Sequence, residues 1–109
     1  MSTVYILQEN PHSPKNFLPA EEFGELVILF QHHISPTLIN RCIAQLREKL
    51  RGMTKNDWII PVGHPALIAA AGYVAHDLTG EINILSWDQQ TRQYIPIRIN
   101  PNGPNPTGN

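Results

Sequence analysis

The sequence predicts a small α/β domain on a mostly parallel sheet, with a β-hairpin at its C-terminal end. Strand-like apolar runs alternate with two helical patterns, each of which begins at a proline and stops at a glycine. A polar turn separates the last two strand-like runs. Strand–helix–strand units pair their strands in parallel through right-handed crossovers. We therefore expect a Rossmann-like sheet in two or three layers.

The length and composition suit one domain. The chain has 109 residues, of which 41% are hydrophobic and 16% charged, as in a packed globular protein. We assign residues 1–99 to a single α/β domain. Residues 100–109 contain only Pro, Asn, Gly and Thr, so we expect them to form a disordered tail.

The first elements lie between the N-terminus and residue 30. The strand formers of 3–7 predict a first strand, and three prolines between residues 10 and 19 predict a loop. Residues 20–23 can open a helix, whereas 25–30 contain five consecutive apolar residues and indicate a strand covered on both faces. A helix across the whole block is the alternative, and Gly24 counts mildly against it.

Residues 35–52 predict the first long helix. Ser35 suits the N-cap and Pro36 the first helical position, and Gly52 supplies the stop. Apolar residues recur between them at spacings of three and four: Leu38, Ile39, Cys42, Ile43, Leu46 and Leu50. Cys42 lies on this stripe, so we expect a packed small side chain rather than a nucleophile.

The second half predicts strand, helix, strand, strand. Residues 58–63 form a short strand, where Pro61 suggests a sheet edge or a bulge. A helix runs from residue 65 to near residue 80 and is rich in alanine, so we expect it to lie close against a sheet or a second subunit. Residues 82–87 and 94–99 then form a hairpin whose last strand is an edge, marked by Pro96.

Charge and cysteine content exclude several classes of protein. The net charge is −1, from eight basic and nine acidic residues, so direct nucleic-acid binding is not favoured. That alternative would depend on the cations of one helix, which otherwise suit a solvated helix end: Arg41, Arg47, Lys49 and Arg51. A single cysteine permits no internal disulfide. With no signal peptide pattern and no apolar run of membrane length, we expect a cytoplasmic protein.

Polar residues follow the predicted strands, at the edge where parallel sheets bind ligands. The candidate ligand-binding residues are His32, His33, Gly63, His64, Pro65 and Asp88. At the centre of this edge, Gly63 would allow close backbone approach and the following helix start would favour an anion. The alternative is that Gly63 only permits a turn and His64 only caps the helix.

No catalytic or cofactor motif fills this edge. The glycines form neither phosphate-binding pattern, and the histidines lack a metal-ligand spacing such as H-x-x-x-H. His32 and His33 are adjacent, so on a strand they would point to opposite sides. No nucleophile stands out beside His64. We therefore expect no cofactor, no metal and no enzymatic activity.

A second candidate surface is an interface with another protein. Trp87, Arg92 and Tyr94 surround the predicted hairpin, and aromatic and arginine side chains are common interface anchors. Gly72 and Tyr73 add the small-residue helix to this candidate interface. Alternatively, Trp87 and Tyr94 pack on each other across the hairpin.

Two segments resemble a pattern in small proteins of tailed bacteriophages. The first runs from Val62 to Ala71, and the second from Leu85 to Gln90 with Arg92, Tyr94, Ile95 and Pro96. The resemblance spans residues 58–99 and departs from the pattern at His64, where an acidic residue is expected. It implies a phage or prophage origin and a host-cytoplasm setting. The family carries no established activity, cofactor or catalytic residue.

Together these observations predict a non-enzymatic phage accessory protein. We expect it to bind a host or phage protein and to associate with itself. One alternative is a small-molecule or nucleotide-binding domain, with or without hydrolytic activity, whose site lies at the carboxyl edge of the sheet. The other is a nucleic-acid-binding accessory protein.

Overall fold

The computed structural model describes residues 2–9, 16–32 and 34–101. His33 and most of the predicted tail, residues 102–109, therefore lie outside the described residues. The elements in chain order are β1 (Thr3–Gln8), the 3₁₀ helix η1 (Leu18–Phe23), β2 (Glu25–Phe30), the 3₁₀ turn η2 (Pro36–Leu38), α1 (Ile39–Lys49), β3 (Trp58–Ile60), α2 (Pro65–Thr79), β4 (Ile82–Asp88) and β5 (Gln93–Ile99).

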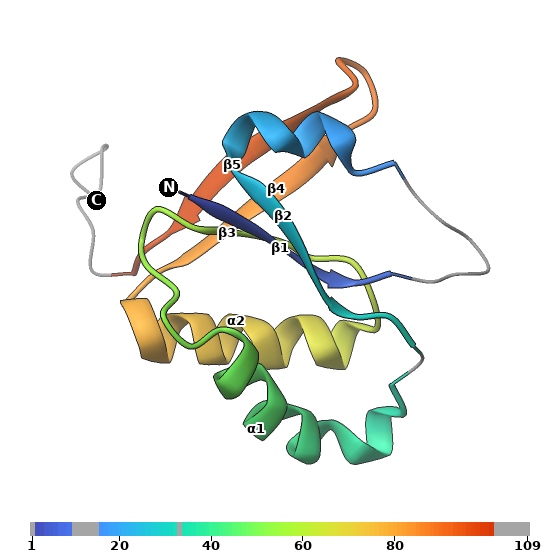
Figure 1. Cartoon of the computed structure of the whole chain (residues 1–109), viewed down its shortest axis with the longest axis vertical. Coiled ribbons are helices and arrows are strands. Elements are labelled where there is room, and N and C mark those ends of the chain that lie inside the picture. Colours follow the sequence, from blue (N-terminus) through green and yellow to red (C-terminus); the bar gives the residue numbers. More distant parts are fainter. Residues whose placement is uncertain (1, 10–15, 33, 102–109) are drawn as a thin grey trace.

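The five strands form one sheet in the order β2-β1-β3-β4-β5 (Figure 1). β1 pairs in parallel with both β2 and β3, and β3 pairs in parallel with β4. β4 and β5 are antiparallel, in a register that runs from Ile82 opposite Ile99 to Asp88 opposite Gln93. The predicted mostly parallel α/β sheet with a C-terminal hairpin is confirmed.

The helices lie on opposite faces of this sheet. α1 and α2 cover one face, and η1 lies over the other (Figure 1). The chain steps one way from β1 to β2 and the opposite way from β2 through β3 to β4. Right-handed crossovers in opposite directions must pass over opposite faces, so the strand order itself places η1 across the sheet from the two α-helices.

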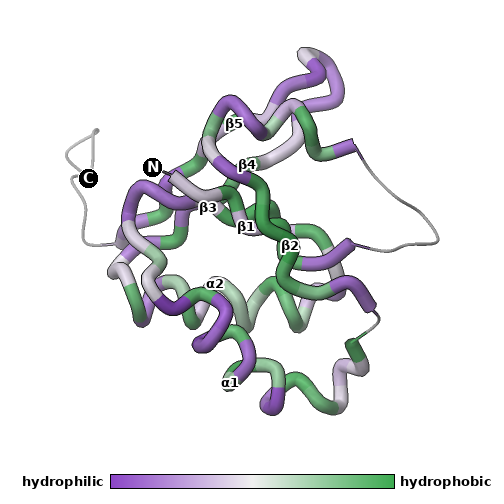
Figure 2. Tube along the Cα trace, in the orientation of Figure 1, coloured by the Kyte–Doolittle hydropathy of each residue, from purple (hydrophilic) through white to green (hydrophobic). Residues whose placement is uncertain are grey.

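A hydrophobic core lies on each face. The helix-side core joins α1 and α2 to the sheet around Leu7, Leu46 and Leu67, none of which is exposed. The η1-side core is smaller and lies around Ile6, Trp58 and Leu85. In Figure 2 the hydrophobic colouring follows β2 and much of α2, whereas the turn between β4 and β5 is polar. The larger core thus lies between the sheet and the two α-helices, and η1 covers only part of the other face.

Residues 20–30 form a short helix followed by a strand, as we predicted. Gly24 separates them with a φ of +152°, and a Cβ there would run into the backbone of Ser2. β2 is an edge strand, so our expectation that both of its faces are covered holds only towards Phe30. Val27 in its first half is 37% exposed.

Two local interpretations need correction. Ser35 is the N-cap and Pro36 lies in the first helical turn, as expected, but the Ser35 hydroxyl pairs with the Thr37 hydroxyl at 2.9 Å and makes no capping hydrogen bond. The first turn is the 3₁₀ turn η2, and α1 follows it directly, three residues after Pro36. Pro61 marks neither an edge nor a bulge, because the central strand β3 ends before it at Ile60.

Candidate functional site

At the carboxyl ends of β1 and β3, where we predicted a ligand, the protein places its own glutamine. The Gln8 side chain donates from Nε2 to the His32 carbonyl oxygen at 2.8 Å. A Cβ on Gly63 would lie 2.5 Å from Gln8 Oε1, and the φ of Gly63 is +131°. Gly63 does allow a close approach, as expected for a glycine here. The group that approaches is Gln8.

His64 and Pro65 form the start of α2. The His64 Nδ1 accepts a hydrogen bond from the Ala66 amide at 3.0 Å, and Pro65 occupies the first helical turn. The His64 lone pair thus satisfies an amide that a helix leaves unpaired at its N-terminus. This geometry favours the capping alternative over a ligand-binding role. His32 is exposed and lies edge-on to the Phe30 ring, with the centroids 6.3 Å apart.

Asp88 organises the turn between β4 and β5. Its carboxylate accepts hydrogen bonds from the Thr91 hydroxyl at 2.7 Å and the Gln90 amide at 3.2 Å. These bonds, that of Thr91 foremost, lower the pKa of Asp88 because they stabilise its charged form. Its carbonyl accepts from the Arg92 amide as well. All these partners lie in the turn, so Asp88 is not joined to His64.

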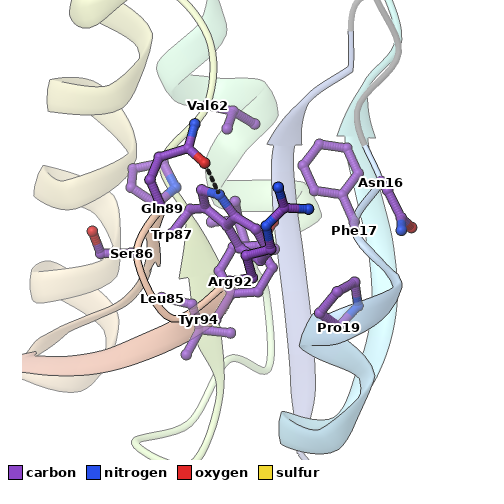
Figure 3. Close-up of a pocket in the computed structure, with 12 residues that line it drawn as sticks. Asn16, Phe17, Pro19, Val62, Leu85, Ser86, Trp87, Gln89, Arg92 and Tyr94 are labelled. Atoms are coloured by element: carbon purple, nitrogen blue, oxygen red, sulfur yellow. Dashed lines mark hydrogen bonds between the residues drawn. The ribbon is translucent and has the colours of Figure 1, made fainter.

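A cleft of about 760 Å³ opens on the η1 side of the sheet, at the carboxyl ends of β3 and β4 (Figure 3). Three of our predicted interface residues line it: Trp87, Arg92 and Tyr94. The remaining lining residues are Asn16, Phe17, Pro19, Ile60, Pro61, Val62, Leu85, Ser86 and Gln89. The Ser86 side chain points away from the others in Figure 3, as strand alternation requires next to Leu85 and Trp87.

Two aromatic rings form one wall of this cleft. Trp87 and Tyr94 are opposite each other in the hairpin, and their rings meet edge to face with centroids 5.0 Å apart. The packing alternative that we kept for this pair is therefore what the structure shows. Trp87 remains 40% exposed, and its Nε1 donates to Gln89 Oε1 at 3.4 Å. These contacts thus fix the two rings in the wall and leave the cleft open.

Two donors on the cleft have no partner in the described part of the chain. The guanidinium of Arg92 makes no hydrogen bond or ion pair there, and the Tyr94 hydroxyl makes no hydrogen bond. Burial raises the pKa of Tyr94, so its hydroxyl keeps its proton at neutral pH. Arg92 has a φ of 55°, the one positive value among the described non-glycine residues. The cleft therefore offers hydrogen-bond donors to an acceptor.

The other predicted interface residues lie on the opposite face of the sheet. Gly72 packs inward, because a Cβ there would be 3.6 Å from the Ile82 side chain. Tyr73 is 57% exposed and carries the Arg47 guanidinium 5.6 Å from its ring centroid. Both residues line a groove of about 260 Å³ beside the β4–β5 hairpin.

Isoleucines dominate the hairpin on this side. We call them the isoleucine face: Ile82, Ile84, Ile95, Ile97 and Ile99. The cross-strand register places Ile82 opposite Ile99 and Ile84 opposite Ile97, so these side chains share one face. On β5, residues 95, 97 and 99 are 41%, 39% and 43% exposed. α2 thus leaves the outer half of this face open.

The cations considered for nucleic-acid binding are mostly engaged with neighbours. Arg47 forms an ion pair with Asp77 at 2.6 Å, and the hydrogen bond that it donates to that carboxylate raises the pKa of Arg47. Arg51 lies 3.5 Å from Glu48, and Lys49 lies 5.3 Å from the centre of the Phe30 ring. These contacts support the solvated-helix-end interpretation.

Sequence reasoning missed one important residue in each of two regions, the edge beside Gly63 and the cleft beside η1. Gln8 is the last residue of β1, and nothing local shows that its side chain would reach Gly63 and His32. Phe17 lies beside a proline-rich segment, and only the tertiary fold brings it to the hairpin. Within the described ranges, no three His, Cys, Asp or Glu residues are grouped so as to hold a metal ion.

The fold and cleft define a small α/β protein with an open groove on each face of one sheet. The chain belongs to the Phage Pam3 gp32-like protein family, whose model matches residues 2–101. This match extends the phage resemblance from residues 58–99 to almost the whole chain. No curated protein and no solved structure matches the chain. None of the helices described is both long and apolar enough to cross a membrane.

Proposed function

We propose that this phage protein is a non-enzymatic accessory protein of the host cytoplasm that acts by binding proteins, and that it first binds a second copy of itself. The isoleucine face supports this proposal. In an antiparallel pair with one face in water, that face normally carries polar residues. On the open half of the isoleucine face, all three β5 positions are instead isoleucine: Ile95, Ile97 and Ile99.

The chemistry around the isoleucine face favours a partner that is itself apolar. The adjoining groove is lined by aliphatic, glycine, proline and tyrosine side chains and by no charged residue. A second copy offers the same surface, and two copies related by a two-fold axis bury both faces at once. The net charge of −1 gives little long-range repulsion between copies.

The geometry of β5 favours packing face to face over strand pairing. β5 is an edge strand, but Pro96 at its middle has no N–H to donate to a neighbouring strand. A continuous sheet through two β5 strands would lack that hydrogen bond. Packing the exposed halves of Ile95, Ile97 and Ile99 against their symmetry mates needs no backbone donor.

The test is the oligomeric state of Ile97→Lys. We expect the unmodified chain to form a dimer in sedimentation velocity and light scattering over a range of concentrations. Ile97 lies in the centre of the exposed strand face, and each substitution counts twice in a two-fold interface. The dissociation constant should rise by roughly a hundredfold when two side chains lose their apolar burial.

Leu18→Lys is the matched control. Leu18 is an exposed aliphatic residue of similar size, 63% exposed, on η1 across the sheet. Its replacement adds the same charge and should leave the dimer intact. A strictly monomeric unmodified chain, or equal weakening by both substitutions, would contradict the proposal.

A further inference from the structure

We propose that the cleft beside η1 binds a small organic anion with a flat apolar ring, such as a nucleoside monophosphate or an aromatic carboxylate. The ring lies against the aromatic and aliphatic walls, and the anionic group meets the Arg92 guanidinium. This site is separate from the isoleucine face, which lies on the other side of the sheet. It is also separate from the Gly63–His64 turn that the sequence first suggested.

The size and lining of the cleft match a small-molecule site. Its volume of about 760 Å³ lies within the roughly 300–1,000 Å³ typical of ligand pockets. Such pockets are mostly apolar, with a few polar groups that fix orientation. Here the apolar walls include Phe17, Val62 and Leu85, and the polar groups come from the hairpin and from Asn16.

The polar groups of the cleft select for an acceptor. None of its twelve lining residues is acidic, whereas Arg92 contributes a permanent positive charge. Neither the Arg92 guanidinium nor the Tyr94 hydroxyl has a partner in the described part of the chain. A carboxylate or phosphate would supply acceptors and form charge-assisted hydrogen bonds. A cationic ligand would meet only repulsion from Arg92.

The arrangement of side chains selects for a flat ring. In Figure 3 the Trp87 indole, the Arg92 guanidinium and the Phe17 ring all lie around the cleft. The edge-to-face contact with Tyr94 holds the indole in place, and Gln89 binds its N–H. Aromatic rings and the guanidinium plane both stack well on flat π systems. The cleft also lies on the η1 face towards the carboxyl ends of β3 and β4, close to the edge at which parallel sheets bind ligands.

The two tryptophans allow a direct test in the full chain. Trp87 lines the cleft and is 40% exposed, whereas Trp58 is 8% exposed in the η1-side core. Each gives one indole N–H signal in a nitrogen–proton correlation spectrum. We expect AMP and UMP in one arm, and indole-3-acetate and benzoate in the other, to shift the Trp87 signal much more than that of Trp58. The arms show whether the anion is a phosphate or a carboxylate.

The charge requirement is tested by neutral analogues and by Arg92→Asn. Asparagine tolerates a positive φ, so this substitution removes the cation with little backbone strain. Affinity for the anionic probes should fall about tenfold or more, as expected for a charge-assisted bond. Binding of adenosine or indole-3-acetamide, already weak, should change little. Arg41→Asn and His64→Ala are the controls and should leave every affinity unchanged.

Three outcomes would overturn the proposal. The first is no selective Trp87 shift with any anionic probe up to about 5 mM, beyond the range of weak millimolar sites. The second is that Arg92→Asn lowers the affinity for anionic and neutral probes equally, which would assign Arg92 a purely structural role. The third is equal weakening by Arg41→Asn, which would reveal non-specific charge attraction. None of these outcomes bears on self-association, which Ile97→Lys tests separately.

Discussion

Two arginines of β5 and its turn lie at opposite ends of the sheet and differ in their contacts. At the amino end, Arg98 donates to the Lys55 carbonyl at 2.9 Å, lies 3.6 Å from Glu81 and covers the Trp58 ring at 4.7 Å. At the carboxyl end, Arg92 has no such partner in the described residues. Arg98 is thus engaged by the fold, whereas the Arg92 guanidinium remains available to the ligand that we propose.

The amino end also contains the most buried carboxylate among the described residues. Asp57 is 5% exposed and accepts hydrogen bonds from the Thr3 and Thr54 amides, both at 2.8 Å. The Thr54 hydroxyl adds a third at 3.2 Å. Asn83 nearby donates to the Lys55 carbonyl at 3.0 Å, although its Oδ1 has no partner in the described chain. This network links the starts of β1, β3 and β4.

Asp57→Ala should have the largest effect on stability. The substitution leaves two backbone amides without their acceptor in a partly buried site, and we expect the free energy of unfolding to fall by about 3 kcal/mol. Urea unfolding followed by circular dichroism measures this change. Asp77→Ala is the control, because its ion pair with Arg47 is exposed and should contribute less than about 1 kcal/mol. Equal losses in the two variants would show that the buried Asp57 carboxylate contributes no more to stability than an exposed ion pair.

Gly63→Ala should have the next largest effect on stability. It tests whether the Gln8 side chain fills the space between the carboxyl ends of β1 and β3. An added Cβ meets Gln8 Oε1 at 2.5 Å, and the φ of +131° is strained for any L side chain. We expect a loss of about 2 kcal/mol in the free energy of unfolding. Gly52→Ala is matched in φ sign, at +87°, but its Cβ meets nothing within 4 Å.

The difference between the two glycine variants isolates the contact with Gln8. Gly52→Ala carries only the backbone strain and should cost about 1 kcal/mol. Adding Gln8→Ala to Gly63→Ala should recover part of its loss, because the contact with Gln8 Oε1 is removed, whereas the contact with the Cβ of residue 8 at 3.1 Å and the backbone strain remain. Should Gly63→Ala prove no worse than Gly52→Ala, the glutamine would not close this edge, and a ligand site there would be open again.

The sequence predicted the sheet well because its signals were local. The proline starts, the glycine stops and the alternation in β4 and β5 each lie within a few residues, so they place the elements without tertiary information. The candidate site was harder, because it depends on contacts between distant residues. That Gln8 would fill the edge beside Gly63, and that Phe17 would face Trp87, follows only from the packed fold.

The smallest predicted effect concerns the pKa of Asp88. This pKa tests whether the Asp88 carboxylate only stabilises the turn or also belongs to the proposed ligand site beside it. The Thr91 hydroxyl is the main cause that lowers this pKa below its ordinary value of 3.8. Because the pKa is lower in the folded chain, the interaction stabilises the hairpin above the unfolded-state pKa and is lost as the pH falls through the folded-state pKa. Thr91→Val removes the hydroxyl, so the Asp88 pKa should rise towards 3.8.

A carbon-detected NMR titration of the carboxyl signals measures that pKa. Thr37→Val is the control, since its hydroxyl pairs with Ser35 at 2.9 Å in a different turn, and it should leave the Asp88 pKa unchanged. The anionic probes of the cleft should move this pKa less than Thr91→Val does, because Asp88 is not among the residues that line the cleft and only charge repulsion without direct contact can act on it. A probe-dependent shift comparable with that of Thr91→Val would place Asp88 in the ligand site and erase the distinction between the turn and the cleft.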